Sequence, residues 1–170
     1  MADPRTILVV MGVSGSGKTT IASALAQHLG WPFKDGDELH PAANIAKMRA
    51  GHALDDHDRW PWLARIADWI DARRAAGSCG VITCSALKRS YRELLTEGRP
   101  EVRIVYLHGD QSLIAARLAA RHGHFMPSDL LASQFAALEE PGPDEQAIRV
   151  EVDQPVSDIV AVIAAALRQP

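Results

Sequence analysis

The sequence has little of what marks secreted, membrane-spanning or nucleic-acid-binding proteins. Its two cysteines, Cys79 and Cys84, lie five residues apart on one predicted strand, beyond the about 7 Å between Cα atoms that a disulfide spans. No apolar run approaches the roughly 20 residues of a membrane helix, and residues 1–5 lack the segments of a signal peptide. The net charge of −3 provides no basic field for nucleic acid or anionic lipid. We therefore expect a cytoplasmic protein with no nucleic-acid or membrane partner.

What the sequence does have is enough apolar residues for one packed domain over residues 1–170, with 47% hydrophobic and 23% charged residues. Short apolar segments that predict strands alternate with segments of helical pattern, and no linker or repeat interrupts them. Such alternation predicts an α/β fold with a five-stranded parallel sheet, helices on both faces and ligands at the carboxyl edge. The expected strands are 6–11, 31–35, 80–85, 102–107 and 147–152, and the expected helices are 18–29, 41–50, 59–76, 87–97, 111–122, 127–138 and 156–168.

Residues 12–19 read Gly-Val-Ser-Gly-Ser-Gly-Lys-Thr and stand between the first strand and the first helix. This is the G-x-x-x-x-G-K-[ST] pattern in the context that a phosphate-binding loop requires, and it predicts a P-loop nucleoside-triphosphate hydrolase fold. The glycines let backbone N–H groups surround an anion at the positive end of the helix dipole. We expect Lys18 to be catalytic at the transferred phosphate and Thr19 to bind Mg²⁺, with ATP as the nucleotide. The predicted cofactor-binding residues here are Gly12, Val13, Ser14, Gly15, Ser16, Gly17, Lys18, Thr19 and Thr20.

The second predicted strand ends in Asp35-Gly36-Asp37, which places two carboxylates on the same side of an extended chain. Phosphoryl transfer needs one carboxylate near Mg²⁺ and another near the acceptor hydroxyl. Asp35 is therefore the predicted metal residue, acting through a water, and Asp37 the predicted catalytic base. The alternative is a polar turn in which an aspartate caps a short helix.

A polar face follows on the next predicted helix, where His40, Asn44 and Lys47 are spaced i, i+4, i+7. Beside an acceptor site, this face suits a hydroxylated anion. The alternative is a face that is only solvated.

Arg59 stands at the start of the following predicted helix, for which Asp58 suits the N-cap and Pro61 fits only the first turn. A guanidinium fixed there would bind a carboxylate through two hydrogen bonds. A surface ion pair with Asp55 or Asp56 is the alternative.

Hydrogen-bond donors gather after the third predicted strand, at Ser85, Lys88, Arg89 and Arg92. The sequence has no Walker B aspartate there and no Asn-Lys-x-Asp motif, which argues against motor ATPases and GTPases. Ser85 and Lys88 are predicted to bind substrate, and it stays open which of the three basic residues makes the contact.

Two arginines one helical turn apart, Arg117 and Arg121, precede a segment that contains glycine, and we expect a lid over about 121–127. Arg117 is predicted to stack on adenine, and Arg121 to reach the phosphates as a catalytic residue. The loop that includes Pro155 follows the last strand, where an adenine edge could meet backbone groups.

Taken together, these motifs resemble the gluconokinase family from Ile7 to Pro155. The resemblance implies ATP-dependent phosphorylation of D-gluconate at its 6-hydroxyl, a shikimate-kinase-like fold of the nucleoside-monophosphate-kinase group with a lid, and often a homodimer. It also implies substrate contacts by Asp37, His40, Asn44, Lys47, Arg59, Ser85, Lys88 and His124. A shikimate or nucleoside-monophosphate kinase and an inactive nucleotide-binding module remain alternatives. The matching segments are residues 12–19, Asp35-Gly-Asp-x-x-His40-Pro41, Asn44-x-x-Lys47-Met48, Asp58-Arg59-x-Pro-Trp62-Leu63, Cys84-Ser-Ala-Leu-Lys88-Arg-x-Tyr91-Arg92, His124-Phe-Met-Pro, Ser133-Gln134-Phe135-x-x-Leu138-Glu139-x-Pro141 and Asp153-Gln-Pro155.

Overall fold

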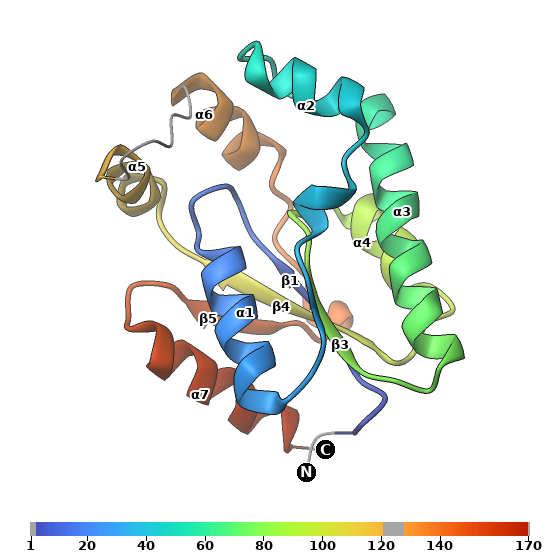
Figure 1. Cartoon of the computed structure of the whole chain (residues 1–170). Helices are drawn as coiled ribbons and strands as arrows, with labels where there is room; N and C mark the ends of the chain where they lie inside the picture. The colour runs from blue at the N-terminus through green and yellow to red at the C-terminus, as the bar shows by residue number, and fades with distance from the viewer. Residues whose placement is uncertain (1–2, 121–127, 170) are drawn as a thin grey trace.

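One parallel sheet of five strands forms the centre of the molecule, as predicted, in the order β2-β3-β1-β4-β5 (Figure 1). The computed structural model describes residues 3–120 and 128–169. The strands are β1 (Ile7–Met11), β2 (Phe33–Lys34), β3 (Gly80–Thr83), β4 (Val102–His108) and β5 (Ile148–Glu151). Because β1 lies in the middle of the sheet, the glycine-rich loop that follows it leaves from the best-supported strand.

Helices cover both faces of the sheet: α1 and α7 pack on one face, and α3 and α4 on the other (Figure 1). Three further helices, α2, α5 and α6, lie beyond the carboxyl ends of the strands (Figure 1). No helix among the described residues is long and apolar enough to cross a membrane. The helices are α1 (Lys18–Leu29), α2 (Ala42–Arg49), α3 (Asp56–Ala75), α4 (Arg89–Thr96), α5 (Gln111–Ala120), α6 (Ser128–Ala137) and α7 (Val156–Leu167), with short 3₁₀ helices η1 (Gly36–Leu39) and η2 (Pro143–Glu145).

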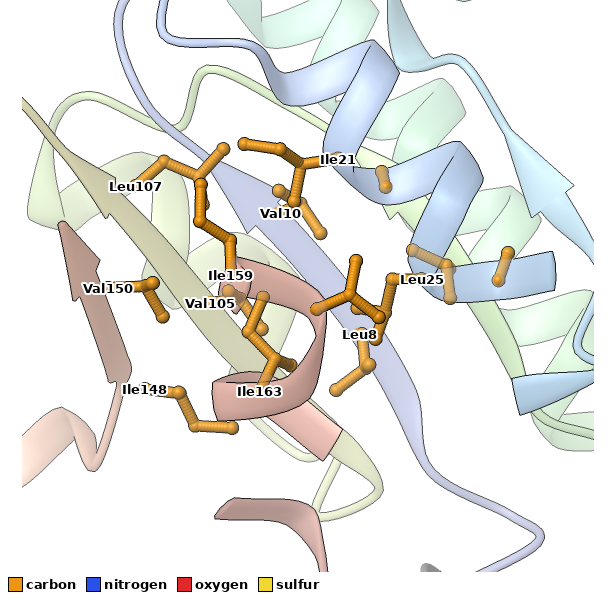
Figure 2. Packing of buried hydrophobic residues seen from close by; sticks show 14 of the residues in the cluster. Leu8, Val10, Ile21, Leu25, Val105, Leu107, Ile148, Val150, Ile159 and Ile163 are labelled. Carbon is orange, nitrogen blue, oxygen red and sulfur yellow. The ribbon is translucent and has the colours of Figure 1, made fainter. Parts of the chain in front are cut away.

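The central strand β1 is fully buried, and its side chains alternate between two apolar layers. Leu8 and Val10 pack with Ile21 of α1 and Ile163 of α7 (Figure 2). Ile7, Val9 and Met11 pack on the opposite face against the side chains of α3 and α4. A strand buried on both faces resists displacement, so the sheet holds the loop at residues 12–17 in a defined place.

The start of α3 differs from the prediction. The helix begins at Asp56, and its N-cap is Asp55, whose carboxylate accepts a hydrogen bond from the backbone N–H of Asp58 at 2.8 Å. Asp58 in turn accepts from the backbone N–H of Asp55 at 3.0 Å, which closes a capping box between the N-cap and the residue three positions later. The prediction of Asp58 as the N-cap was therefore wrong, and Pro61 lies in the second turn, where its missing N–H removes one helical hydrogen bond.

Candidate functional site

The glycine-rich loop between β1 and α1 has the backbone that its sequence predicts. Gly15 and Gly17 have φ angles of 82° and 95°, in the left-handed region that favours glycine, and Gly17 is the N-cap of α1. The Lys18 ammonium donates hydrogen bonds to the carbonyl oxygens of Gly12 at 3.0 Å and Val13 at 3.1 Å. The lysine charge thus lies against the loop that is expected to hold the phosphates.

The hydroxyl groups of this region face different ways. Ser16 is buried, and its Oγ donates to the carbonyl of Val13 at 2.7 Å, so it braces the loop from inside. Thr19 and Thr20 are exposed in the first turn of α1. Thr19 is therefore accessible to a cation that arrives with nucleotide phosphates.

Asp35 has an extended backbone, but Asp37 lies in η1, so the prediction that both stand on an extended chain was wrong. Asp35 is the N-cap of η1, and its Oδ1 accepts from the backbone N–H of Asp37 at 3.0 Å and from the Thr83 hydroxyl at 3.1 Å. The Thr83 hydroxyl in turn accepts from the Gly36 N–H at 3.0 Å, and Trp62 Nε1 donates to the Gly36 carbonyl at 2.8 Å. The capping geometry left open as the alternative is the one observed, and it fixes both aspartates to β3 and α3.

A cavity of about 620 Å³ opens between the glycine-rich loop, η1, α2, α3 and α6. Six of the predicted site residues line it: Ser14, Lys18, Asp37, His40, Arg59 and Ser85. The others that line it were not predicted: Ile45, Met48, Arg49, His52, Ala53, Leu54, Trp62, Leu130, Ser133 and Gln134. The cavity is thus shared by the phosphate-binding loop and the predicted acceptor region.

Arg59 places a positive charge on this cavity. Its Nη1 donates to the Tyr91 hydroxyl at 3.3 Å, and the guanidinium carbon lies 5.6 Å from the centre of the Tyr91 ring. Within the described parts of the chain, Arg59 has no carboxylate within ion-pair distance, because Asp55 and Asp56 pair with Lys47 at 3.8 Å and Lys88 at 2.9 Å. The alternative of a surface ion pair is therefore not observed, and the arginine can bind an anionic ligand.

Lys47, Lys88 and Asn44 are not among the residues that line the cavity. The Lys47 ammonium lies 2.6 Å from the Asp58 carboxylate, whose pKa is lowered by this hydrogen bond. Asn44 is buried, and its amide nitrogen contacts the Asp58 carbonyl at 2.9 Å and His40 Nδ1 at 3.2 Å. The prediction of one helix face for His40, Asn44 and Lys47 was wrong in part: Asn44 and Lys47 lie on α2, but His40 is the C-cap of η1 and has an extended backbone. The lysine and the asparagine bind neighbouring protein groups.

His40 is buried and stacks on Trp62, with ring centroids 4.1 Å apart and an angle of 14° between the planes. Burial lowers the pKa of His40, and the nearby Arg59 charge adds to this effect while the Asp37 carboxylate opposes it. The imidazole is therefore neutral near pH 7.

The two remaining basic residues near β3 bind acidic residues. Arg92 is 1% exposed and donates to Glu145 at 2.6 Å and to the Ala86 carbonyl at 2.9 Å. Arg89 pairs with Asp144. Like Lys88, neither arginine is among the residues that line the cavity, and both attach η2 to α4.

The predicted adenine-binding residues lie near the last strand. Arg117 of α5 donates to the Val152 carbonyl at 2.6 Å, just after β5, and Pro155 is exposed as the N-cap of α7. Arg121 and His124, and with them the predicted lid over 121–127, lie outside the described residues.

Gln134 of α6 lines the cavity and was not among the predicted site residues. Its Oε1 accepts from the Ser14 backbone N–H at 2.7 Å, and its Nε2 donates to Ser14 Oγ at 2.9 Å. This pair attaches α6 to the phosphate-binding loop. No local signal could have revealed it, because the partners are 120 residues apart.

The donor set fits a cation that is carried by a nucleotide. Among the described residues there is no group of three or more His, Cys, Asp or Glu side chains that could hold a metal ion. Mg²⁺ typically binds through one or two protein oxygens and several phosphate or water oxygens. Thr19 and Asp35 can supply such oxygens.

Comparison with known proteins agrees with this geometry. A family model described as an AAA domain matches residues 7–141. The gluconokinase of Gluconobacter oxydans (strain 621H) is 54% identical over 147 residues, which cover 86% of this chain and 82% of that protein. The thermoresistant gluconokinase of Escherichia coli (strain K12) is 48% identical over 156 residues, which cover 91% and 89%.

Solved structures give the same result. The crystal structure of a gluconokinase from Sinorhizobium meliloti 1021 has a TM-score of 0.89 at 46% identity, covering 98% of this chain and 93% of that one. Shikimate kinase from Aquifex aeolicus, with a TM-score of 0.58 at 14% identity over 95% and 96% of the two chains, shares the fold alone. The sequence identity, the P-loop kinase fold and the cavity shared by loop and acceptor region lead to one conclusion: the chain belongs to the gluconokinase family.

Proposed function

We propose that this chain is a gluconokinase, which transfers the γ-phosphoryl group of ATP to the 6-hydroxyl of D-gluconate and forms 6-phospho-D-gluconate and ADP. The observation that carries the proposal is that Lys18, Asp37 and Arg59 line the same cavity. These side chains supply a cation for the phosphates, a carboxylate for the acceptor hydroxyl and a second cation for the substrate carboxylate. The names of the relatives described above support the same substrate.

In the transfer, the acceptor hydroxyl oxygen forms a bond to the γ-phosphorus while the bond to the oxygen that bridges β and γ breaks. The hydroxyl proton passes to the Asp37 carboxylate, and ADP leaves with the electron pair of the broken bond. Lys18 and the N–H groups of the loop stabilise the charge that develops on the phosphate oxygens. Asp37 suits this role because it lines the cavity and because hydrogen bonds of the preceding Gly36 to β3 and α3 hold the backbone of its turn in place.

Mg²⁺ is the proposed second cofactor. Thr19, and Asp35 through a water, would hold it, and when bound with nucleotide it supplies positive charge to the phosphates. Thr83 restrains Asp35 from the protein side, through the 3.1 Å hydrogen bond to Oδ1.

The test is a coupled assay of ADP release with D-gluconate, D-glucose, shikimate and AMP as acceptors. We expect turnover with gluconate and little with the other three, since a site that binds a carboxylate and hydroxyls rejects acceptors without them. Asp37→Asn should lower kcat by about a hundredfold or more, with a smaller change in the KM for ATP. Glu38→Gln is the matched control, because Glu38 is an exposed neighbour on η1 that pairs with Lys34. Equal activity with glucose and gluconate would contradict the proposal.

Two further points rest on the family resemblance and the free thiols. We propose a homodimer, which light scattering of the purified protein tests. We also propose the cytoplasm as its location, because Cys79 and Cys84 are both free cysteines and reduced thiols are typical of that compartment.

A further inference from the structure

The orientation of one buried amide determines which nitrogen of His40 carries a proton. Asn44 Nδ2 lies 2.9 Å from the backbone carbonyl oxygen of Asp58, which can only accept a hydrogen bond. The amide NH₂ must therefore be on this side, because the reversed amide would place two acceptors against each other. The Asn44 orientation follows from the surroundings.

The same NH₂ group lies 3.2 Å from His40 Nδ1. A donor on Asn44 requires an acceptor on His40, so Nδ1 is unprotonated and the neutral ring carries its hydrogen on Nε2. A doubly protonated imidazolium would place Nδ1–H against the NH₂ group. Stacking on Trp62, with centroids 4.1 Å apart, holds the plane of the ring, and a half-turn within that plane would place a C–H group instead of Nδ1 against the Asn44 NH₂.

We propose, on the basis of the proposed function, that Asn44 is a positioning residue that fixes His40 as an Nε2–H donor, and that this donor binds an oxygen of the hydroxylated acid in the cavity. His40 lines the cavity, and within the described chain its Nε2 has no hydrogen-bond partner. Asn44 thus acts through His40 and needs no contact with substrate. The arrangement also excludes His40 as the general base, because Nε2 has no lone pair to accept a proton.

Several charged groups surround this pair. Asp37 on η1 favours the protonated ring, and Arg59 on α3 disfavours it. Asp58, whose backbone carbonyl accepts from the Asn44 amide, pairs through its carboxylate with Lys47. Lys18, Arg49 and His52 line the same cavity as His40. Burial and Arg59 together keep the ring neutral, in agreement with the tautomer that Asn44 requires.

The direct test is nitrogen-15 NMR of the imidazole rings in the full-length protein without ligand, with His40→Gln to assign the signal. We expect the Nε2–H tautomer for His40 at pH 7.5, with Nδ1 shifted as an acceptor, and protonation only at a lower pH than for an ordinary histidine, because burial lowers its pKa. His28, exposed on α1, provides a reference ring in the same sample. The Nδ1–H tautomer, or a His40 pKa above that of the reference, would overturn the assignment without any use of activity.

The kinetic test is Asn44→Asp, which has nearly the same shape but reverses the hydrogen-bond polarity. A carboxylate at this position favours Nδ1–H and raises the pKa of His40. Nε2–H is then present below the raised pKa, in the imidazolium, and is lost above it, where the neutral ring takes the Nδ1–H tautomer. The KM for gluconate of this variant should rise about five- to tenfold between about pH 6 and 9, while the wild-type value stays flat over the same range.

His40→Gln supplies a side-chain NH₂ without a titratable ring, so its KM for gluconate should be independent of pH with or without Asn44→Asp. A destabilised but otherwise unaffected site would change KM equally at every pH, and that result overturns the positioning role. If the wild type shows the Nε2–H tautomer but does not phosphorylate gluconate, the proposed substrate fails while the tautomer assignment stands. If it phosphorylates gluconate but shows Nδ1–H, the substrate stands and this inference fails.

Discussion

The turn that carries the two aspartates should not accept a side chain at its middle residue. A Cβ atom added at Gly36 would lie 1.9 Å from the backbone oxygen of Thr83 and 3.4 Å from Ile66 Cδ1. The nearest obstacle is a backbone atom of a central strand, so no rotamer change relieves the clash. Gly36→Ala must therefore move η1 away from β3 by roughly 1 Å to reach a tolerable contact.

The size of the effect follows from what this movement breaks. Overpacking of a buried site typically costs about 1–3 kcal/mol, and the loss of the hydrogen bond from Gly36 N–H to the Thr83 hydroxyl adds about 1 kcal/mol. We therefore expect the free energy of unfolding to fall by about 2–4 kcal/mol. A displacement of about 1 Å at Asp37 can lower kcat by about a hundredfold, because the acceptor hydroxyl is no longer aligned with its base.

Urea denaturation and the coupled ADP assay measure the two effects separately. Gly77→Ala is the control: Gly77 lies between α3 and β3, has a φ of 62°, and an added Cβ would meet nothing within 4 Å. The left-handed backbone makes this control less stable by about 1–2 kcal/mol, but kcat should not change. If Gly36→Ala keeps kcat within about twofold of wild type, the role of the turn in placing Asp37 is refuted.

Three further predictions concern charged residues. Arg59→Ala should raise the KM for gluconate by about 10- to 100-fold and leave the KM for ATP within about twofold; equal changes in both would remove the arginine from the carboxylate site. Arg92→Leu should lower the free energy of unfolding in urea by about 3–5 kcal/mol, because Glu145 is left without its buried partner, and Glu145→Gln in the same chain should restore part of the loss. The Arg99 guanidinium lowers the pKa of Asp71 to about 2. The stabilisation that this ion pair gives the folded state is therefore complete above the ordinary pKa of about 4 and is lost as the pH falls towards 2. Asp71→Asn should accordingly flatten the acid side of a profile of thermal stability against pH.

The sequence predicted best those features whose signal is local. The strand Ile7–Met11 and the glycine-rich loop after it are specified by residues adjacent in the sequence, and both are observed where they were expected. The start of α3 was missed because Asp55 and Asp58 are equally good caps by residue type. Only the reciprocal hydrogen bonds of the capping box, at 2.8 and 3.0 Å, favour the earlier one.

The site was predicted less completely because its contacts are long-range. Helical spacing predicted that His40 and Asn44 are neighbours, and their side chains do lie 3.2 Å apart, although His40 precedes α2. It could not show that the Asn44 amide turns to the Asp58 carbonyl, 14 residues away. Gln134 stood in a segment that matches the family, but its residue type alone gave it no role, because its partner Ser14 belongs to the first loop of the chain. Side-chain direction, and not residue type, determined the outcome in both cases.

Charge at the site depends on which cations remain unpaired, and the first turn of α3 controls this. Asp56 pairs with Lys88 and also accepts a hydrogen bond from the Tyr91 hydroxyl, to which Arg59 donates. The Asp56 carboxylate therefore neutralises Lys88 and also holds Tyr91, the residue that Arg59 contacts. Since Arg59 itself has no carboxylate within ion-pair distance in the described chain, its charge stays available to an anionic acceptor. A neutral sugar offers no counter-charge for this arginine, and leaving a half-buried guanidinium unpaired in the complex opposes its binding.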